Sequence, residues 1–359
     1  QKRAHERVLY EEFLTSMTVK QASSQRLLFP LELYFSSNEM DLLRELQLSL
    51  EKEAVRAIYR SKKKLQHVKN LFQAANKLAE FEKIDWVQAD ILDIPALEMA
   101  FIDVTYVYHC AALVSFNPKD EDKLYQNNIV GTANVVNLCL STNVKKLSYV
   151  SSIAALGNGT EHNLIVNEET ERNNEAVRSD YSISKFGAEM EVWRGFQEGL
   201  DVVIVNPGVI FGNGFPKEGS SLFIQNIKDG QSFYTLGKLG IVAVEDVVKA
   251  MITLMKSTIS GERFILVAED ITYKELFDRI ANNLQIKKPK YLVKKWQMQI
   301  ASVLEYIFAT LFLRNRMLTK STINSLFNLE VHDTSKIKKA IEFKFCDMKV
   351  ILKELTLKK

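Results

Sequence analysis

Short apolar runs alternate with amphipathic segments along the chain from residue 54 onward. The segments between the runs carry apolar side chains at helical spacing or are rich in Ala and Leu, as at 131–140 and 181–197. Strands that alternate with helices in this way predict right-handed βαβ crossovers and a parallel sheet. An unbroken apolar run such as 202–205 is typical of a strand buried on both faces. The predicted strands cover residues 54–59, 85–88, 104–109, 146–150 and 202–206.

The pattern changes after about residue 266, where helical segments dominate and Lys is frequent. We expect no buried strand beyond 263–267, and therefore predict a smaller, mainly helical C-terminal portion that packs over one edge of the sheet. This portion and the loop 213–240 would form a substrate pocket. The most apolar stretch, 300–313, is too short to span a bilayer, so we favour a helix of the core and keep contact with a membrane as the less favoured alternative.

Composition excludes several classes of protein. The chain has 359 residues with 47 basic and 44 acidic side chains, a net charge of +3 that gives no reason to expect a nucleic-acid partner. Three scattered cysteines suit neither a disulfide framework nor a metal site. The first fourteen residues contain no apolar signal segment, so we expect a reducing, cytoplasmic location.

Small, hydroxyl or charged residues follow each predicted strand. In an open parallel sheet, ligands bind at the carboxyl ends of the strands. These strand ends are therefore expected to form one ligand site along a single edge of the sheet. The residues at these positions are Arg60, Asp90, Ala111 and Ala112, Ser151 and Ser152, and Pro207 and Gly208.

Tyr181 and Lys185 open a predicted helix and share one of its faces. A lysine ammonium near the phenol would lower the pKa of Tyr181 toward neutrality, which suits proton transfer to a carbonyl oxygen. A serine hydroxyl from another strand end could hydrogen-bond the same oxygen. The bare Tyr-x-x-x-Lys spacing occurs four times in the chain, and only this copy both follows a serine-rich strand end and opens an Ala/Glu-rich helix.

Several motifs in their order along the chain resemble the extended short-chain dehydrogenase/reductase family, from about residue 42 to 359. The closest likeness is to its dihydroflavonol-reductase-like and hydroxysteroid-dehydrogenase-like members. The resemblance implies a Rossmann-type doubly wound parallel sheet and a nicotinamide dinucleotide cofactor. The matching segments are His-Cys-Ala-Ala (109–112), Asn128-Ile-Val-Gly-Thr132, Tyr-Val-Ser-Ser-Ile-Ala-Ala-Leu-Gly (149–157), Tyr181-Ser-Ile-Ser-Lys185 and Val-Asn-Pro-Gly-Val-Ile-Phe-Gly (205–212).

The resemblance also implies a role for each site residue. It makes Tyr181 the catalytic acid/base and Lys185 the holder of the nicotinamide ribose. Counting back five positions from Gly157 selects Ser152, rather than Ser151, as the hydroxyl that orients the carbonyl. The remaining implied contacts are Asp90 with adenine, Ala111 and Ala112 with the diphosphate, and Pro207 and Gly208 with the nicotinamide. Asn128 is either the buried residue found at this helix start in the family or a plain N-cap.

Arg60 stands where an acidic residue would bind the ribose of NAD(H). An arginine at this strand end accommodates a 2′-phosphate instead. Three lysines follow directly, so the sequence favours NADP(H), with NAD(H) left open and an exposed turn as the plain alternative.

The glycine-rich turn that receives the diphosphate is missing. The chain has no glycine before Gly131, and the expected positions near Leu33, Ser36 and Glu39 hold bulky or charged side chains. Two explanations are open. The one we favour is that the sequence before residue 42 comes from a shifted reading frame or a misjoined sequence. The other is that the protein has lost its cofactor site. We therefore divide the chain into an aberrant segment (1–41), a Rossmann domain (42–265) and a C-terminal substrate-binding portion (266–359).

The predicted function is an NAD(P)(H)-dependent oxidoreductase that reduces a ketone or aldehyde, or oxidises the alcohol. A nucleotide-sugar epimerase or dehydratase is the first alternative, although Ile153 and Ala154 follow Ser152 where dehydratases carry an Asp-Glu pair. A non-catalytic Rossmann scaffold is the second. The expected partner is a small carbonyl or alcohol substrate, and a homodimer is left open.

Overall fold

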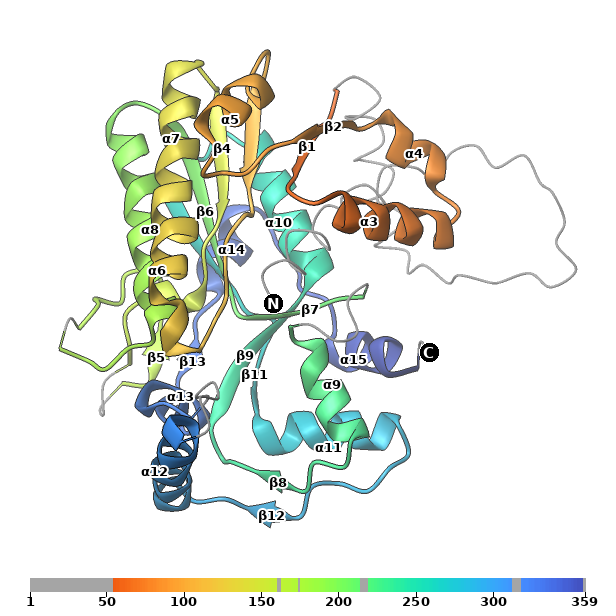
Figure 1. Ribbon diagram of the computed structural model, residues 1–359, viewed down its shortest axis with the longest axis vertical. Helices are drawn as coiled ribbons and strands as arrows, with labels where there is room; N and C mark the ends of the chain where they lie inside the picture. Colours follow the sequence, from red (N-terminus) through yellow and green to blue (C-terminus); the bar gives the residue numbers. More distant parts are fainter. Residues whose placement is uncertain (1–53, 160–162, 174, 214–218, 312–317, 358–359) are drawn as a thin grey trace, which may run out of the picture.

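The computed structural model describes residues 54–159, 163–173, 175–213, 219–311 and 318–357. The predicted aberrant segment, residues 1–41, lies outside these ranges. Figure 1 shows a larger α/β body and a second body that carries a small sheet and several helices.

The larger body is built on a four-stranded parallel sheet. Its strand order is β10-β6-β4-β3, so strands distant in sequence are neighbours in space, as crossover connections require. The predicted parallel arrangement is confirmed for these strands. They are β3 (Tyr106–His109), β4 (Lys146–Val150), β6 (Asp201–Pro207) and β10 (Glu262–Leu266).

Helices cover both faces of this sheet (Figure 1). Successive side chains of a strand point to opposite faces, and β6 divides its side chains accordingly between two cores. Val202 and Ile204 pack with α7 (Gly131–Ser141) and α8 (Asp180–Gln197). The intervening Val203 and Val205 pack with α10 (Val244–Lys256). This two-sided burial explains why the strand is an unbroken apolar run.

A second parallel sheet contains only β1 (Arg56–Tyr59) and β2 (Asp85–Gln88) among the described residues. In a doubly wound sheet of order 3-2-1-4-5-6, β2 and β1 correspond to strands 3 and 2, and β3, β4 and β6 to strands 4, 5 and 6. The place of the first strand therefore lies between β1 and β3, where the structure has a cavity of about 1200 Å³. Among the described residues, β1 and β2 therefore pair on the far side of this place from the four-stranded sheet.

The second body is not purely helical. It contains a three-stranded sheet of order β11-β9-β7, whose last strand by sequence, β11, begins at Glu269. The expectation that no buried strand follows 263–267 is therefore wrong, because Ile271 of β11 is buried in the core of this body. Its main elements are β7 (Val209–Phe211), α9 (Ser221–Lys228), β9 (Lys238–Ala243), β11 (Glu269–Thr272), α11 (Tyr273–Asn283) and α15 (Met348–Leu357).

Shorter elements complete the described chain. Two two-stranded pairs, β5 with β13 and β8 with β12, lie outside the main sheets. The remaining elements are α3 (Lys62–Ala74), α4 (Leu78–Lys83), α5 (Ile94–Ala100), α6 (Glu121–Leu124), β5 (Ile165–Val166), β8 (Phe233–Tyr234), β12 (Tyr291–Leu292), α12 (Lys295–Leu311), α13 (Lys320–Leu326), β13 (Val331–His332) and α14 (Ser335–Ala340).

Candidate active site

Tyr181 and Lys185 lie one turn apart at the start of α8. Ser179 caps this helix, since its side chain accepts a hydrogen bond from the Ser182 backbone N–H at 3.1 Å. Lys185 Nζ donates to the Val150 carbonyl at 2.8 Å, which holds the start of the helix against the carboxyl end of β4. Tyr181 is half-buried and Lys185 is buried. Both residues therefore lie at the sheet edge where the sequence places the ligand site.

The two serines after β4 have different partners. Ser152 precedes a short 3₁₀ turn, its Oγ accepts from the Ala154 N–H at 3.1 Å, and its hydroxyl lies near enough to the Tyr181 phenol to lower the pKa of that phenol. Ser151 is buried, and its Oγ donates to Glu189 Oε2 at 2.5 Å. The structure therefore places the Ser152 hydroxyl against Tyr181 and occupies the Ser151 hydroxyl elsewhere.

Burial dominates the titration of the tyrosine. It raises the pKa of Tyr181 to about 12, against a smaller lowering by the hydrogen bond with Ser152. The predicted pKa near neutrality is wrong for this arrangement, because desolvation of the phenolate outweighs the favourable interactions. The Lys185 ammonium donates to the Tyr149 hydroxyl at 2.7 Å. Burial, followed by the charge of Glu189, raises the pKa of Tyr149 as well.

Glu189 is a buried carboxylate that sequence reasoning missed. Its side chain is 0% exposed, and it joins α8 to the ends of three strand segments. Glu189 accepts from Ser151 Oγ at 2.5 Å, Asn206 Nδ2 at 2.8 Å, Arg263 Nη1 at 3.0 Å and Trp193 Nε1 at 3.4 Å. Tyr181, Lys185, Glu189 and Trp193 follow one another at steps of four residues, so they lie on one face of the helix. This pattern could have identified Glu189 from the sequence.

Asn206 connects this carboxylate to Ser152. Its Nδ2 donates to both Glu189 Oε2 and the Ser152 carbonyl, the latter at 3.1 Å. Its Oδ1 is buried without a hydrogen-bond partner among the described residues. Asn206 therefore fixes the backbone that carries the Ser152 hydroxyl and leaves one acceptor for a further group.

Pro207 and Gly208 follow at the end of β6. The Gly208 N–H donates to the Leu266 carbonyl at 3.0 Å, and a Cβ atom on Gly208 would lie 2.4 Å from the Gly240 carbonyl oxygen. Only glycine allows this approach of two backbones.

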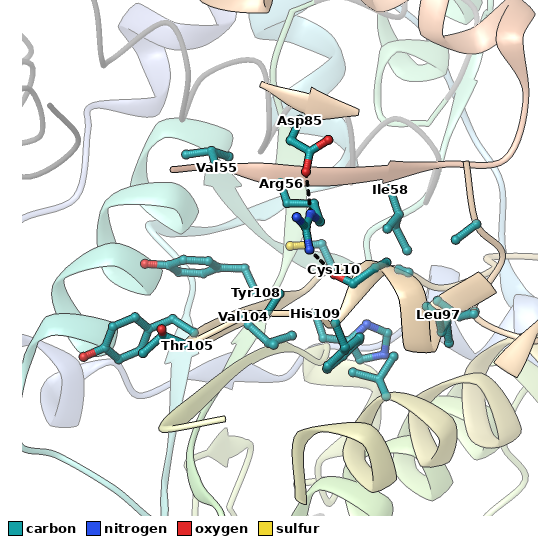
Figure 2. Close-up of a pocket in the computed structure, with 18 of the residues that line it drawn as sticks. Val55, Arg56, Ile58, Asp85, Leu97, Val104, Thr105, Tyr108, His109 and Cys110 are labelled. Carbon is teal, nitrogen blue, oxygen red and sulfur yellow. Dashed lines mark hydrogen bonds and ion pairs between the residues drawn. The ribbon is translucent and has the colours of Figure 1, made fainter. Parts of the chain in front are cut away.

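The predicted adenine-side residues meet at the ends of β1 and β2. Arg60 Nη1 lies 3.3 Å from Asp90 Oδ2 and donates to Asn127 Oδ1 at 3.2 Å. Arg60, Ala111 and Ala112 line the cavity between β1 and β3. Figure 2 shows side chains of both strands around this cavity, with Arg56 ion-paired to Asp85.

Asn128 links this cavity wall to the helix of the tyrosine. It is fully buried in a π-helical segment, Tyr125–Val130, and does not cap a helix. Its Oδ1 accepts from the Leu113 N–H at 2.6 Å, and its Nδ2 donates to the Leu113 carbonyl and to Ser184 Oγ. The N-cap alternative is therefore wrong, and the loop after β3 is tied to α8.

The described residues fit a dinucleotide cofactor. Ala111 and Ala112 leave room against the backbone, Arg60 provides a cation, and the hydroxyls of Ser152 and Tyr181 meet at the other end of the strand edge. The predicted glycine positions near residues 33–39 lie outside the described residues.

The N-terminal segment is similar to a different protein family. Residues 1–65 match the MutL C terminal dimerisation domain. DNA mismatch repair protein MutL of Flavobacterium johnsoniae is 67% identical over 51 residues, which are 14% of this chain and 8% of that protein. Translation in a shifted frame would not give such identity, so that explanation is excluded. The missing glycines thus fall within sequence that resembles another protein.

The rest of the chain is similar to dinucleotide-dependent enzymes. Anthocyanidin reductase of Arabidopsis thaliana is 26% identical over 257 residues, covering 65% of this chain and 72% of the relative. The fold matches the structure of UDP-glucuronic acid 4-epimerase from Bacillus cereus with a TM-score of 0.65 and 15% identity, over 85% of this chain and 90% of that one. Residues 48–266 match the NAD dependent epimerase/dehydratase profile, and the chain therefore belongs to this family of oxidoreductases with a Rossmann-type fold.

Proposed function

We propose that this protein is an NAD(P)(H)-dependent oxidoreductase that reduces a ketone or aldehyde to the alcohol. The observation that carries the proposal is the proximity of the Ser152 hydroxyl to the Tyr181 phenol, whose pKa it lowers against the larger effect of burial, at the end of β4. Two neighbouring hydroxyls at a ligand-binding strand end can share one substrate oxygen. Lys185 lies one helical turn behind them.

The bound dinucleotide would supply the hydride, and the chain's own residues handle the oxygen and the proton. Because the pKa of Tyr181 is raised to about 12, the phenol carries its proton at neutral pH and can donate it to the carbonyl oxygen. Ser152 holds the same oxygen by a hydrogen bond. The overall change consumes a carbonyl compound, reduced dinucleotide and one proton, and yields an alcohol and the oxidised dinucleotide.

The proposal assigns each part of the cofactor to residues at the strand ends. Lys185 would hold the nicotinamide ribose, and Pro207 and Gly208 would lie beside the nicotinamide. Ala111 and Ala112 would flank the diphosphate, Asp90 would contact adenine, and Arg60 would pair with a 2′-phosphate. We favour NADP(H) for this reason. NAD(H) is the alternative for two reasons. The ion pair with Asp90 already partly neutralises the charge of Arg60. The UDP-glucuronic acid 4-epimerase that shares the fold was solved in complex with NAD.

The substrate class follows from the surroundings of Tyr181. The ring of Phe116 meets the Tyr181 ring edge-on at 5.9 Å, and Phe116 is 50% exposed. An exposed aromatic ring beside the proton donor favours a hydrophobic carbonyl compound. A nucleotide-sugar epimerase is the second candidate, because a solved epimerase shares the fold. Ile153 and Ala154 form the 3₁₀ turn after Ser152 in place of an acidic pair, which favours the reductase.

The test compares this chain with a variant in which a strand, a Gly-x-x-Gly-x-x-Gly turn and a helix replace residues 1–53. Backbone N–H groups at the start of that helix would bind the diphosphate, so we expect NADPH binding in the variant only. NADPH fluorescence gives the affinity, and NADPH oxidation with a panel of ketones and aldehydes gives the activity.

In the same variant, Tyr181→Phe should keep NADPH binding and lower turnover by at least about a hundredfold, because it removes the proton donor. Tyr291→Phe, on the remote strand β12, is the matched control and should change neither quantity. Tight NADPH binding without turnover of any carbonyl substrate would contradict the proposal and favour the non-catalytic scaffold. UDP-sugar epimerisation would favour the second candidate.

A further inference from the structure

Helix α12 presents an apolar face to solvent. Trp296, Ile300, Val303 and Leu304 follow helical spacing and are 56%, 52%, 60% and 52% exposed. The prediction that 300–313 forms a core helix is therefore wrong for the part whose side chains are described. Polar contacts on another side of α12 fix its orientation, since Ser302 Oγ donates to the Leu318 carbonyl and the Leu318 N–H donates to Glu305 Oε2.

The neighbouring strand pair extends this surface. In β8 and β12, Phe233 pairs with Tyr291, and these aromatic side chains are 52% and 68% exposed. Figure 1 shows β8, β12 and α12 at the same end of the molecule, with β12 leading directly into the helix. We call this surface the apolar end face: Phe233, Tyr291, Trp296, Ile300, Val303 and Leu304.

Lysines surround the apolar end face. Residues 286–304 contain five lysines and no acidic residue, whereas the whole chain is nearly balanced in charge. All five are exposed, and none forms an ion pair with another described residue. They are Lys287, Lys288, Lys290, Lys294 and Lys295.

We propose that the apolar end face binds the surface of an anionic phospholipid bilayer. An amphipathic helix lies in the interface between headgroups and acyl chains, and basic residues next to it strengthen its attraction to anionic lipids. The rings of Phe233, Tyr291 and Trp296 suit that boundary, where aromatic side chains concentrate. The lysine ammonium groups pair with lipid phosphates. No helix in the described ranges has the length and apolar character needed to cross a membrane, so α12 lies along the surface.

Charge argues against a second copy of the chain as the occupant. A symmetric dimer through this face would bring its five lysines close to those of the other subunit. Like charges that face each other across an interface oppose association. An anionic bilayer satisfies the apolar surface and the lysines together.

Vesicle flotation of the unmodified chain tests this proposal without any need for catalytic activity. We expect binding to phosphatidylcholine vesicles that contain phosphatidylglycerol, weaker binding as salt increases, and little binding to phosphatidylcholine alone. Trp296 fluorescence should shift to the blue on binding. Because Trp86 and Trp193 are less exposed, Trp296→Phe should remove most of that shift and leave most of the binding.

Substitutions on the face separate its two contributions. Ile300→Ser with Leu304→Ser should abolish vesicle binding, and Lys294→Glu with Lys295→Glu should weaken it by roughly tenfold or more. Met99→Ser and Val350→Ser change side chains that are 64% and 52% exposed on α5 and α15, and these controls should bind normally.

Three results would overturn the proposal. The first is equal binding to vesicles with and without phosphatidylglycerol. The second is a control variant that loses as much binding as the variants of the face. The third is a dimer in sedimentation velocity that Ile300→Ser with Leu304→Ser dissociates, which would identify the face as a contact between copies of the chain.

Discussion

The two parallel sheets differ in how deeply they are buried. Every residue of β4 and all but the first residue of β6 are buried, with a core on each face. In β1 only Ala57 is buried, and no residue of β2 is. The pair packs on a small separate core of Ala57, Val68, Phe72, Phe81 and Ile84. Burial on two faces stabilises the four-stranded sheet far more than the pair.

This difference divides the candidate site. Ser152, Tyr181 and Lys185 are held by the four-stranded sheet and α8, whereas Arg60 and Asp90 lie at the ends of the two-stranded sheet. The place of the first Rossmann strand lies between these sheets, in the cavity lined by Arg60 and Ala111. The two halves of the candidate site therefore depend on different sheets for their positions.

The largest effect is expected at Glu189, which links α8 to the four-stranded sheet. Glu189→Leu would leave the Arg263 guanidinium without its buried carboxylate, and should lower the free energy of unfolding by about 3–5 kcal/mol. Glu189→Gln retains the shape and one acceptor, and should cost about 1–3 kcal/mol. Urea unfolding measures both variants, and equal losses would show that the charge contributes nothing.

A matched pair of core substitutions tests whether the two sheets unfold separately. Ile204 and Ile84 are 0% and 6% exposed, one in each core. Ile204→Ala should cost about 2–5 kcal/mol and increase hydrogen exchange throughout the chain. Ile84→Ala should increase exchange mainly in residues 54–88, as expected for a local unit. Increased exchange throughout the chain in both variants would mean that the sheets unfold together.

A pH titration should destabilise the packing of α10 on the four-stranded sheet through Asp246. This α10 carboxyl accepts the Cys346 N–H, and burial raises its pKa from 3.8 to about 6. The folded protein therefore binds this proton more tightly than the unfolded chain, and the resulting stability is lost as pH rises from about 4 to 6. The shift corresponds to about 3 kcal/mol in order of magnitude.

Asp246→Asn provides the control for that titration. The amide keeps an acceptor for the Cys346 N–H and has no charge to desolvate. The variant should therefore not lose stability between about pH 4 and 6, and it should be more stable than the parent at pH 7 by about 1–3 kcal/mol. Urea unfolding at a series of pH values measures this. A variant that shows the same pH dependence as the parent would assign the loss to another group.

The sequence predicts the features that depend on local pattern. The unbroken apolar run at 202–205 predicts β6, and the spacing of Tyr181 and Lys185 places both at the start of α8. Strand ends predict which residues share an edge, because every parallel strand in one sheet has its carboxyl end there. These inferences need only neighbouring residues and the known direction of the strands.

Other features depend on contacts between distant residues. Glu189 bonds to Arg263, 74 positions away, and the acidic residue has no local sign of this partner. The pKa of Tyr181 depends on burial, which the sequence spacing does not reveal. The sequence predicts a core helix where α12 has an exposed apolar face. Apolar residues at helical spacing indicate that one face of a helix is covered, but they do not identify what covers it.

The smallest stability change, and the clearest functional one, is expected at Arg60. Its ion pair with Asp90 is exposed, so Arg60→Gln should alter the free energy of unfolding by no more than about 1 kcal/mol. In the variant with a restored glycine-rich turn, the same change should weaken NADPH binding more than NADH binding, because only NADPH carries the 2′-phosphate. Fluorescence titration of both cofactors measures this preference.

Arg56→Gln is the matched control on the same strand. Arg56 pairs with Asp85 at 2.6 Å and donates to the carbonyls of Ala100 and Ile102, so it ties the two-stranded sheet to the end of α5. Its loss should cost about 1–3 kcal/mol of stability and leave the ratio of NADPH to NADH affinity unchanged. If Arg56→Gln changed that ratio as much as Arg60→Gln, the preference would arise from the position of the whole two-stranded sheet. A change confined to Arg60→Gln would assign the preference to the guanidinium beside Asp90.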